Sequence, residues 1–147
     1  MRTARYLTLL ALAVALSLIL AGCGGGGGGG GIDARYVGAW TAVWNTPGTT
    51  DAGTGNISVN NSGVVSGSLT NQITHITFNV SGNLANNGVF VGSFTYPDST
   101  TYTTRGQINI VSAGLEGVLT VYSASNTPLA TVNITLTRSG GVPVFPL

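Results

Sequence analysis

From residue 36 onward, apolar and polar residues alternate in short runs that are separated by clusters of Asn, Gly, Ser and Asp. Alternation with a period of two places the apolar side chains on one face of a β-strand. The pattern predicts eight short strands and no helix. These strands are expected at residues 36–44, 55–59, 65–70, 76–80, 90–95, 106–110, 115–120 and 130–138.

Three of these strands repeat at a step of 25 residues with the shared pattern apolar-x-Gly-x-apolar-Thr: 65–70, 90–95 and 115–120. Each copy follows a cluster of Asn, Ser or Gly, and such residues suit tight hairpin turns because Asn and Gly tolerate positive φ. Each copy is therefore predicted to be the second strand of a hairpin. A repeat of this length also occurs in solenoids, but three hairpins with polar outward faces fit a meander better.

An antiparallel sheet of eight strands protects its edges by closing into a barrel or by splitting into a sandwich. Gly67, Gly92 and Gly117 lie in the middle of predicted strands, where glycine is typical of sharp bends and close backbone approach. We therefore expect an all-β domain at residues 32–147, a single eight-stranded antiparallel up-and-down barrel, with a β-sandwich as the alternative. Side chains can fill so small a barrel, so we expect a filled interior rather than an open cavity.

The same alternation could also be inverted, with apolar side chains facing lipid as in an outer-membrane barrel. Aromatic residues make up only 7% of the chain, which is too few for aromatic girdles. The predicted strands are also shorter than the roughly 9 to 11 residues that cross a membrane. Both observations argue against the inverted arrangement.

The first residues of the chain have the pattern of a secretory signal. Arg2 and Arg5 precede an apolar run at residues 7–21 that contains two polar residues. A membrane-spanning helix needs about 20 apolar residues, so this run is too short to be a permanent span. We predict a helical signal peptide at residues 1–22 that is removed on export.

The end of this segment, Leu20-Ala21-Gly22-Cys23, resembles the lipobox of bacterial lipoprotein precursors. The resemblance implies cleavage before Cys23, followed by attachment of a diacylglyceryl group and an acyl chain such as palmitate. Two or more chains make an anchor durable, whereas one chain binds membranes only marginally. The alternative is an ordinary signal peptide with an incidental cysteine. Because Gly24 rather than aspartate follows the cysteine, the resemblance favours the outer membrane of a Gram-negative cell envelope.

The lipidated Cys23 and the following glycines form a predicted tether at residues 23–31. The eight glycines at 24–31 have no side chains to bury, so they favour a flexible coil. Such a coil has a root-mean-square reach of roughly 15 Å and a limit of about 28 Å. A phosphate-binding loop is not expected, because no Lys-Ser or Lys-Thr pair follows.

The two ends of the barrel domain resemble the calycin pattern of lipocalins and avidins. The first strand contains Gly38-Ala39-Trp40 and the last ends at Arg138. The resemblance implies that Arg138 packs across the Trp40 indole to close one end, and that a ligand binds at the barrel mouth. Avidins line their cavity with tryptophans of later strands, whereas this chain has none after Trp44, so biotin is not the expected ligand.

Charge excludes some partners. The chain has five Lys+Arg and four Asp+Glu. Removal of the signal peptide leaves Arg35, Arg105 and Arg138 against four carboxylates, a net charge of −1. A basic footprint for nucleic acid is therefore absent. Cys23 is the sole cysteine, so the exported domain has no disulfide.

Few residues suit catalysis. His75 is the single histidine, and we predict it on the outward face of the strand at 76–80. Asp51 and Asp98 lie in predicted loops, and Glu116 occupies an outward strand position. These groups do not converge by sequence on a common centre, so we expect no enzyme, metal site or cofactor.

Trp44, Tyr96 and Tyr102 lie near predicted strand ends or loops. Aromatic side chains there pack the barrel ends or stack on a ligand, and we expect the first role with the second as the alternative. The resulting hypothesis is a membrane-anchored lipoprotein whose barrel binds a small apolar ligand or an envelope protein. The alternative is a structural or surface-coat lipoprotein with a filled barrel. An enzyme is a third and weaker hypothesis, and oligomeric state stays open.

Overall fold

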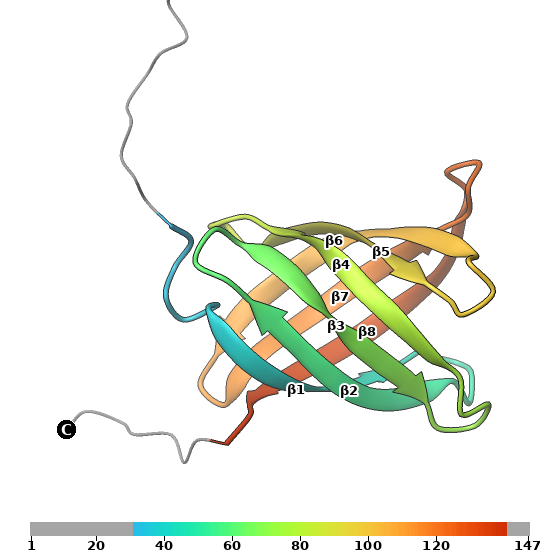
Figure 1. The fold of residues 1–147 in the computed structure, drawn as a ribbon, viewed down its shortest axis with the longest axis horizontal. Helices are drawn as coiled ribbons and strands as arrows, with labels where there is room; N and C mark the ends of the chain where they lie inside the picture. The colour runs from blue at the N-terminus through green and yellow to red at the C-terminus, as the bar shows by residue number, and fades with distance from the viewer. Residues whose placement is uncertain (1–30, 141–147) are drawn as a thin grey trace, which may run out of the picture. The chain divides into compact units, whose positions relative to one another are not determined.

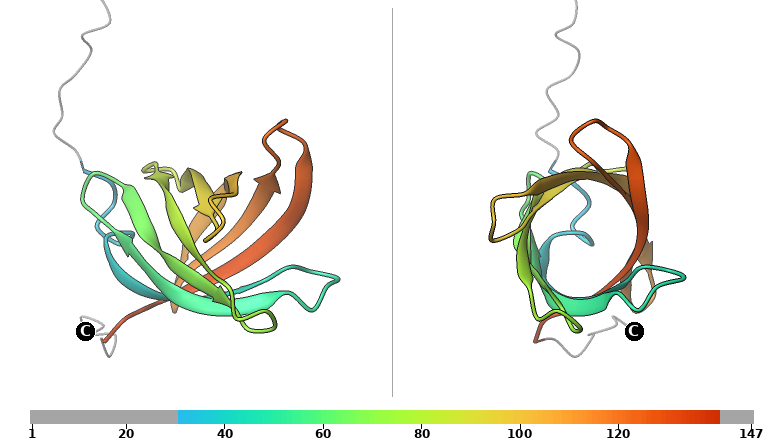
Figure 2. Two further views of the ribbon diagram at one scale, coloured as in Figure 1. Left: turned by 45° about the vertical axis from the view of Figure 1, so that its right-hand side comes forward. Right: turned by 90° about the vertical axis from the view of Figure 1, so that its right-hand side faces the viewer.

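The computed structural model describes residues 31–140. Within this range each strand pairs with the next, and β8 pairs with β1, so the sheet is a closed antiparallel barrel (Figures 1 and 2). The predicted all-β up-and-down barrel is confirmed, and the β-sandwich alternative is wrong. The strands are β1 (Gly38–Asn45), β2 (Ala52–Val59), β3 (Val64–Asn71), β4 (Thr77–Leu84), β5 (Val89–Thr95), β6 (Thr101–Val111), β7 (Gly114–Tyr122) and β8 (Pro128–Arg138).

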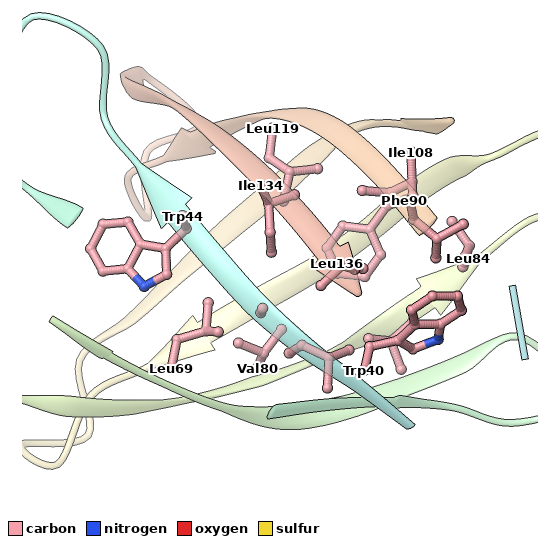
Figure 3. Close-up of a cluster of buried hydrophobic side chains, with 14 of the residues drawn as sticks. Trp40, Trp44, Leu69, Val80, Leu84, Phe90, Ile108, Leu119, Ile134 and Leu136 are labelled. Carbon is pink, nitrogen blue, oxygen red and sulfur yellow. The ribbon is translucent and has the colours of Figure 1, made fainter. Parts of the chain in front are cut away.

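The apolar residues of the alternating pattern point into the barrel. They form one core cluster to which all eight strands contribute (Figure 3). The outward positions hold hydroxyl side chains that pair across strands, such as Thr70 with Thr77 at 2.8 Å. The inverted arrangement with an apolar outer face is therefore not observed. Our strand lengths were partly wrong, because β6 and β8 each run for 11 residues.

The mid-strand glycines allow close packing where the barrel coils. A Cβ added to Gly67 would lie 2.9 Å from the Cα of Ile57 on the neighbouring strand. A Cβ at Gly92 would meet the Phe90 ring at 2.5 Å and the Cα of Gly82 at 3.1 Å. These are the close approaches that the sequence predicted, and only a residue without a side chain fits them.

Two sets of connections distinguish the ends of the barrel. The tight turns at 60–63, 85–88 and 112–113 join β2 to β3, β4 to β5 and β6 to β7, as the Asn/Gly clusters predicted. We call this the closed end. The longer loops at 46–51, 72–76, 96–100 and 123–127 lie at the opposite end, which we call the mouth (Figure 1).

Residues 32–37 cross the closed end before β1 begins. The Ile32 amide donates to Asn61 O at 3.1 Å, and the Asp33 amide donates to Asn86 Oδ1 at 2.7 Å. Tyr36 is 4% exposed, and its hydroxyl donates to Ile108 O at 3.1 Å. The segment thus joins three hairpins. The predicted first strand began at residue 36, but β1 begins at Gly38 because Tyr36 belongs to this covering turn.

Trp40 and Arg138 complete the closed end as the calycin resemblance implied. Trp40 is 2% exposed, and its Nε1 donates to Tyr36 O at 2.9 Å. The Arg138 guanidinium carbon lies 4.6 Å from the Trp40 ring centroid, and its nitrogens donate to Val37 O at 3.1 Å and Arg35 O at 3.3 Å. Gly38 has φ 140°, and a Cβ there would lie 2.8 Å from Arg138 Nη1. Gly38 therefore leaves the space that the guanidinium occupies.

The placement of His75 on a strand is wrong. β4 begins at Thr77, and His75 lies in the exposed loop that follows Asn71, with φ 56°. The Asn71 side chain organises this loop, because its Oδ1 accepts hydrogen bonds from the amides of Ile73 at 2.8 Å and Thr74 at 3.0 Å. These bonds hold residues 72–76 in a loop, so β4 begins at Thr77 and Ile76 is exposed.

The barrel draws its core from its own strands and from residues 32–37. The described residues 31–140 also belong to one compact unit, which is separate from the segment before residue 31. We therefore expect a chain of residues 24–147 to fold without the segment that precedes it. Between residues 31 and 140 there is no helix with the length and apolar character to cross a membrane.

Candidate functional site

A cavity of about 400 Å³ lies at the mouth of the barrel. Its lower wall is the apolar core of β3, β7 and β8, and its rim comes from the loops at 46–51 and 96–100. A register irregularity between Val121 and Tyr122 adjoins it, which is a common feature of barrel rims. Aliphatic residues of its lining are Leu69, Val121, Leu129, Ala130 and Val132.

Five aromatic rings line the cavity: Trp44, Phe78, Phe94, Tyr96 and Tyr102. Phe78 is at the centre of the group. It stacks on Tyr96 with centroids 4.9 Å apart, meets Trp44 edge to face at 5.8 Å and lies 5.4 Å from Phe94. Tyr96 also meets Tyr102 edge to face at 5.7 Å. The cluster forms one continuous aromatic wall.

The structure brings together all three aromatic residues that the sequence singled out. Trp44 is buried, whereas Tyr96 and Tyr102 are half-buried at the rim. They pack against other aromatic rings, as expected, and they also line the cavity. Stacking on a ligand, the alternative, stays a prediction. Phe78 and Phe94 were missed, because their positions in the alternation marked them only as core residues.

Two carboxylates lie at the rim of the same cavity. Asp51 is in the β1–β2 loop, where its Oδ1 accepts a hydrogen bond from Asn71 Nδ2 at 3.1 Å. Asp98 is in the β5–β6 loop. His75 and Glu116, the other two groups weighed for catalysis, are not among the residues that line the cavity. The two carboxylates come from loops of different hairpins, which line the cavity from different sides of the barrel.

The loop around Asp98 explains its ionisation. The Asp98 Oδ1 accepts a hydrogen bond from the Thr100 amide at 2.9 Å, and the Tyr96 amide donates to Thr100 O at 2.9 Å. The bond from the Thr100 amide, together with one from the Thr100 side chain, lowers the pKa of Asp98. Burial, with Tyr102 and Asp51 nearby, raises the pKa of Tyr96. At neutral pH the rim therefore carries an ionised Asp98 and a protonated Tyr96.

No Lys, Arg or His is among the residues that line the cavity. Two described arginines, Arg35 and Arg138, are at the closed end. The third, Arg105, is on the outer face of β6, where its guanidinium lies 5.4 Å from the Tyr122 ring centroid. None of the three arginines of residues 31–140 is therefore placed to pair with the carboxylates or the rings that line the cavity.

Two buried polar atoms near the mouth have no hydrogen-bond partner among residues 31–140, namely Trp44 Nε1 and Thr104 Oγ1. Thr104 is fully buried on the inward face of β6, one inward position below Tyr102. Most buried polar groups are satisfied, so such atoms call for an explanation. The sequence pattern gave no sign of either one.

Below the cavity the barrel is packed. A void of about 40 Å³ lies in this region, lined by apolar core residues; ten side chains of this core, most of them around the void, are labelled in Figure 3. The expectation of a filled interior is therefore right for the half near the closed end and wrong for the half near the mouth.

The other predicted residues fall in three groups. Gly38, Trp40 and Arg138 meet at the closed end, away from the cavity. Leu20, Ala21, Gly22 and Cys23 lie outside the described residues. Within the part of the chain that is described, no group of three or more His, Cys, Asp or Glu side chains is placed to hold a metal ion.

Comparison of the chain with protein-family models, with curated proteins and with solved structures finds no match.

Proposed function

We propose that this protein is a lipid-anchored module of the bacterial cell envelope whose barrel binds a small, largely apolar molecule at its mouth. The observation that carries the proposal is the aromatic-lined cavity of about 400 Å³. Small-molecule sites typically have volumes of roughly 300 to 1,000 Å³ and combine apolar walls with a few polar groups. A barrel that served only as a scaffold would gain stability by filling this space.

The polar atoms around the cavity support a binding role. Asp51, Asn71 and Asp98 offer side-chain oxygens or nitrogens at the rim, while the wall below them is aromatic. The Trp44 indole contributes a buried N–H that no described acceptor satisfies. An unmet donor and aromatic side chains that line one cavity are features that a ligand would complete.

The lipid anchor of the proposal rests on Cys23 and the polyglycine segment. The chain enters the barrel at the closed end, where the Ile32 amide bonds to Asn61 O. A tether at residues 23–31 would thus attach to the closed end, and an eight-residue coil stretches at most about 28 Å. This connection would leave the mouth free to receive a ligand from the aqueous phase.

The calycin resemblance adds to the proposal. A closed eight-stranded barrel is compatible with such a fold, and the Trp40–Arg138 contact lies where the resemblance implies it. Calycins bind ligands at the barrel mouth, which is where the cavity lies. We therefore propose that the protein is a calycin-like binding module.

A surface-coat role is the second candidate, and the outer face of the barrel favours it. Hydroxyl pairs such as Ser81 with Ser93 at 3.2 Å and Thr95 with Thr101 at 3.2 Å cover this face. A catalytic role has less support, because the cavity lining has no His, Cys or Lys to act as base or nucleophile. The surface-coat role makes no use of the cavity.

Binding can be tested with residues 24–147 and the neutral fluorescent probe N-phenyl-1-naphthylamine. We expect a rise in probe emission that saturates with added protein. Replacing Ala130, which is half-buried in the cavity lining, with Phe should fill the mouth and weaken binding at least tenfold. Val118→Phe is the matched control, because Val118 is 55% exposed on the outer face of β7.

Equal binding by the Ala130→Phe and Val118→Phe variants would contradict a site at the mouth. Failure of the unsubstituted chain to bind the probe, with its fold confirmed by circular dichroism, would contradict an apolar binding function. The surface-coat role would then be favoured.

The anchor is tested separately in the full chain. Cys23→Ser should abolish incorporation of labelled palmitate and move the domain from the membrane fraction. Labelling that persists in this variant would contradict lipid attachment at Cys23, while the binding proposal would stand.

A further inference from the structure

The charges and rings around the mouth narrow the class of ligand, an inference that rests on the proposed function. We propose that the mouth selects an organic cation, a molecule with an apolar body and a positively charged amine or quaternary ammonium group. Three observations carry this proposal: the sign of the rim charge, the aromatic faces and the division of the cavity into an apolar floor and a polar rim.

The side chains that line the cavity are acidic, without a base among them; His75, in the mouth loop at 72–76, is not part of this lining. Asp51 and Asp98 both line the cavity, and its lining contains no Lys, Arg or His. The Asp51 carboxylate accepts from an uncharged amide, and the Asp98 carboxylate accepts from a backbone amide. Neither bond neutralises the charge, so both carboxylates would attract a cation and repel an anion.

The aromatic wall provides a second attraction for a cation. The faces of tryptophan and tyrosine rings are electron-rich and hold cations within about 6 Å of the centroid. The barrel already uses this contact twice, with Arg138 at 4.6 Å from Trp40 and Arg105 at 5.4 Å from Tyr122. Among the described residues, no arginine makes such a contact with the rings of the mouth. The ring faces that line the cavity and are not packed on another ring thus have no arginine of residues 31–140 against them.

The cavity also separates the two parts that such a ligand needs. Leu69, Phe94 and Val132 form its deeper wall, and each is a buried core residue. The carboxylates lie in the exposed loops at the rim. An apolar body would enter first, and its charged group would remain between Asp51, Asp98 and the rim tyrosines.

Three probes of similar size separate the effect of charge from that of the apolar body: protonated 2-phenylethylamine, 2-phenylethanol and phenylacetate. Each is titrated against residues 24–147 loaded with N-phenyl-1-naphthylamine at pH 7 and low ionic strength. We expect the cation to displace the dye at about a tenfold lower concentration than the alcohol, since rim charge and ring faces both favour it. The anion should displace the dye least. Added salt should reduce the difference.

Isosteric variants test the carboxylates. Asp51→Asn and Asp98→Asn each keep an oxygen for the existing hydrogen bond, and each should reduce the preference for the cation about threefold. The double variant should bind the cation and the alcohol almost equally. Glu116→Gln removes the same charge from the outward face of β7, and it should leave the preference unchanged.

The outcomes distinguish this inference from the proposed function. If the alcohol displaces the dye as well as the cation does, the preference for a cation is overturned, while dye binding at the mouth still supports the function. If the Asp variants bind the dye normally and keep the full preference, the rim carboxylates are not its source and the inference is overturned. If the unsubstituted chain does not bind the dye, the proposed function itself fails.

Discussion

Trp40 and Trp44 are on the same strand, both point into the barrel, and they lie at opposite ends of its core (Figure 3). Trp40 is 2% exposed, donates its N–H to Tyr36 O and is covered by Arg138. Trp44 is 6% exposed, and its N–H has no acceptor among residues 31–140. At the closed end, the covering turn thus accepts the hydrogen bond of the Trp40 indole. At the mouth, the Trp44 indole N–H has no such acceptor and lies beside a cavity.

This difference indicates that the closed end contributes mainly to stability, whereas the mouth has side chains that a ligand could contact. At the closed end, residues 32–37 provide acceptors for Trp40 and Arg138 and a buried Tyr36. At the mouth, no segment of residues 31–140 crosses the opening (Figure 2), and rings meet mainly other rings. Binding sites are often less completely satisfied than the scaffold around them, and they contribute less to stability as a result.

The largest expected effect comes from making the same substitution at both tryptophans. Trp40→Phe removes a satisfied N–H, leaves the buried Tyr36 O without its donor and opens a void, at a cost of about 2 to 4 kcal/mol. Trp44→Phe also loses volume, but it removes a donor whose burial was unfavourable, so we expect a change within about 1 kcal/mol. Urea unfolding followed by circular dichroism measures both.

Val43→Ala is the control for this pair, because Val43 lies on the same strand and is 55% exposed. It should change the free energy of unfolding by about 0.5 kcal/mol or less. Equal losses for the two tryptophan variants would contradict the distinction between the two ends.

Much of the fold was predictable from local sequence, because alternation and turn chemistry act over a few residues. Asn60 and Gly63 show why: the Asn60 Oδ1 accepts from the Val64 amide at 2.9 Å, and Gly63 adopts φ 82°. The error at His75 has a local cause as well. The Asn71 side chain organises a loop where the apolar alternation suggested that a strand had begun.

The site was only partly predictable, because it depends on which loops meet. Trp44, Tyr96 and Tyr102 could be selected from their places near strand ends. The presence of Asp51 and Asp98 in the lining of one cavity could not be predicted, since they lie in loops that are distant in sequence. Phe78 could not be distinguished from a core residue, because a ring that fills the core and a ring that lines a cavity occupy the same inward positions of a strand.

A smaller effect is expected at the seam of the closed end, where Trp40 pairs with Arg138 in the β1–β8 register. Arg138→Ala removes the stacked guanidinium and its bonds to two carbonyls, and because Arg138 is exposed we expect a loss of about 1 to 2 kcal/mol. In a Trp44→Phe background Trp40 is the sole tryptophan, so its emission should shift to longer wavelength as the ring gains contact with water.

Arg138→Lys serves as the control. It keeps the charge but lacks the planar guanidinium that stacks and donates to both carbonyls, so its stability should lie between those of the Arg and Ala forms. Unchanged stability and emission in Arg138→Ala would show that the closed end does not depend on this contact.

The smallest effect concerns the carboxylates of the two ends and extends the comparison from rings to charges. At the closed end, hydrogen bonds from the Arg35 side chain and backbone lower the pKa of Asp33 from 3.8 to about 2. At the mouth, hydrogen bonds from Thr100 lower the pKa of Asp98 instead.

Because the pKa of Asp33 is lowered, the contribution of the Asp33–Arg35 ion pair to stability is complete above pH 3.8 and is lost as the pH falls through about 2. Carboxyl NMR titration should show this midpoint, and Arg35→Gln should return it toward 3.8 while leaving Asp98 unchanged. If Arg35→Gln shifted both titrations equally, the carboxylates of the two ends would not be held by separate partners, and the mouth would not have the unneutralised charge that a cationic ligand requires.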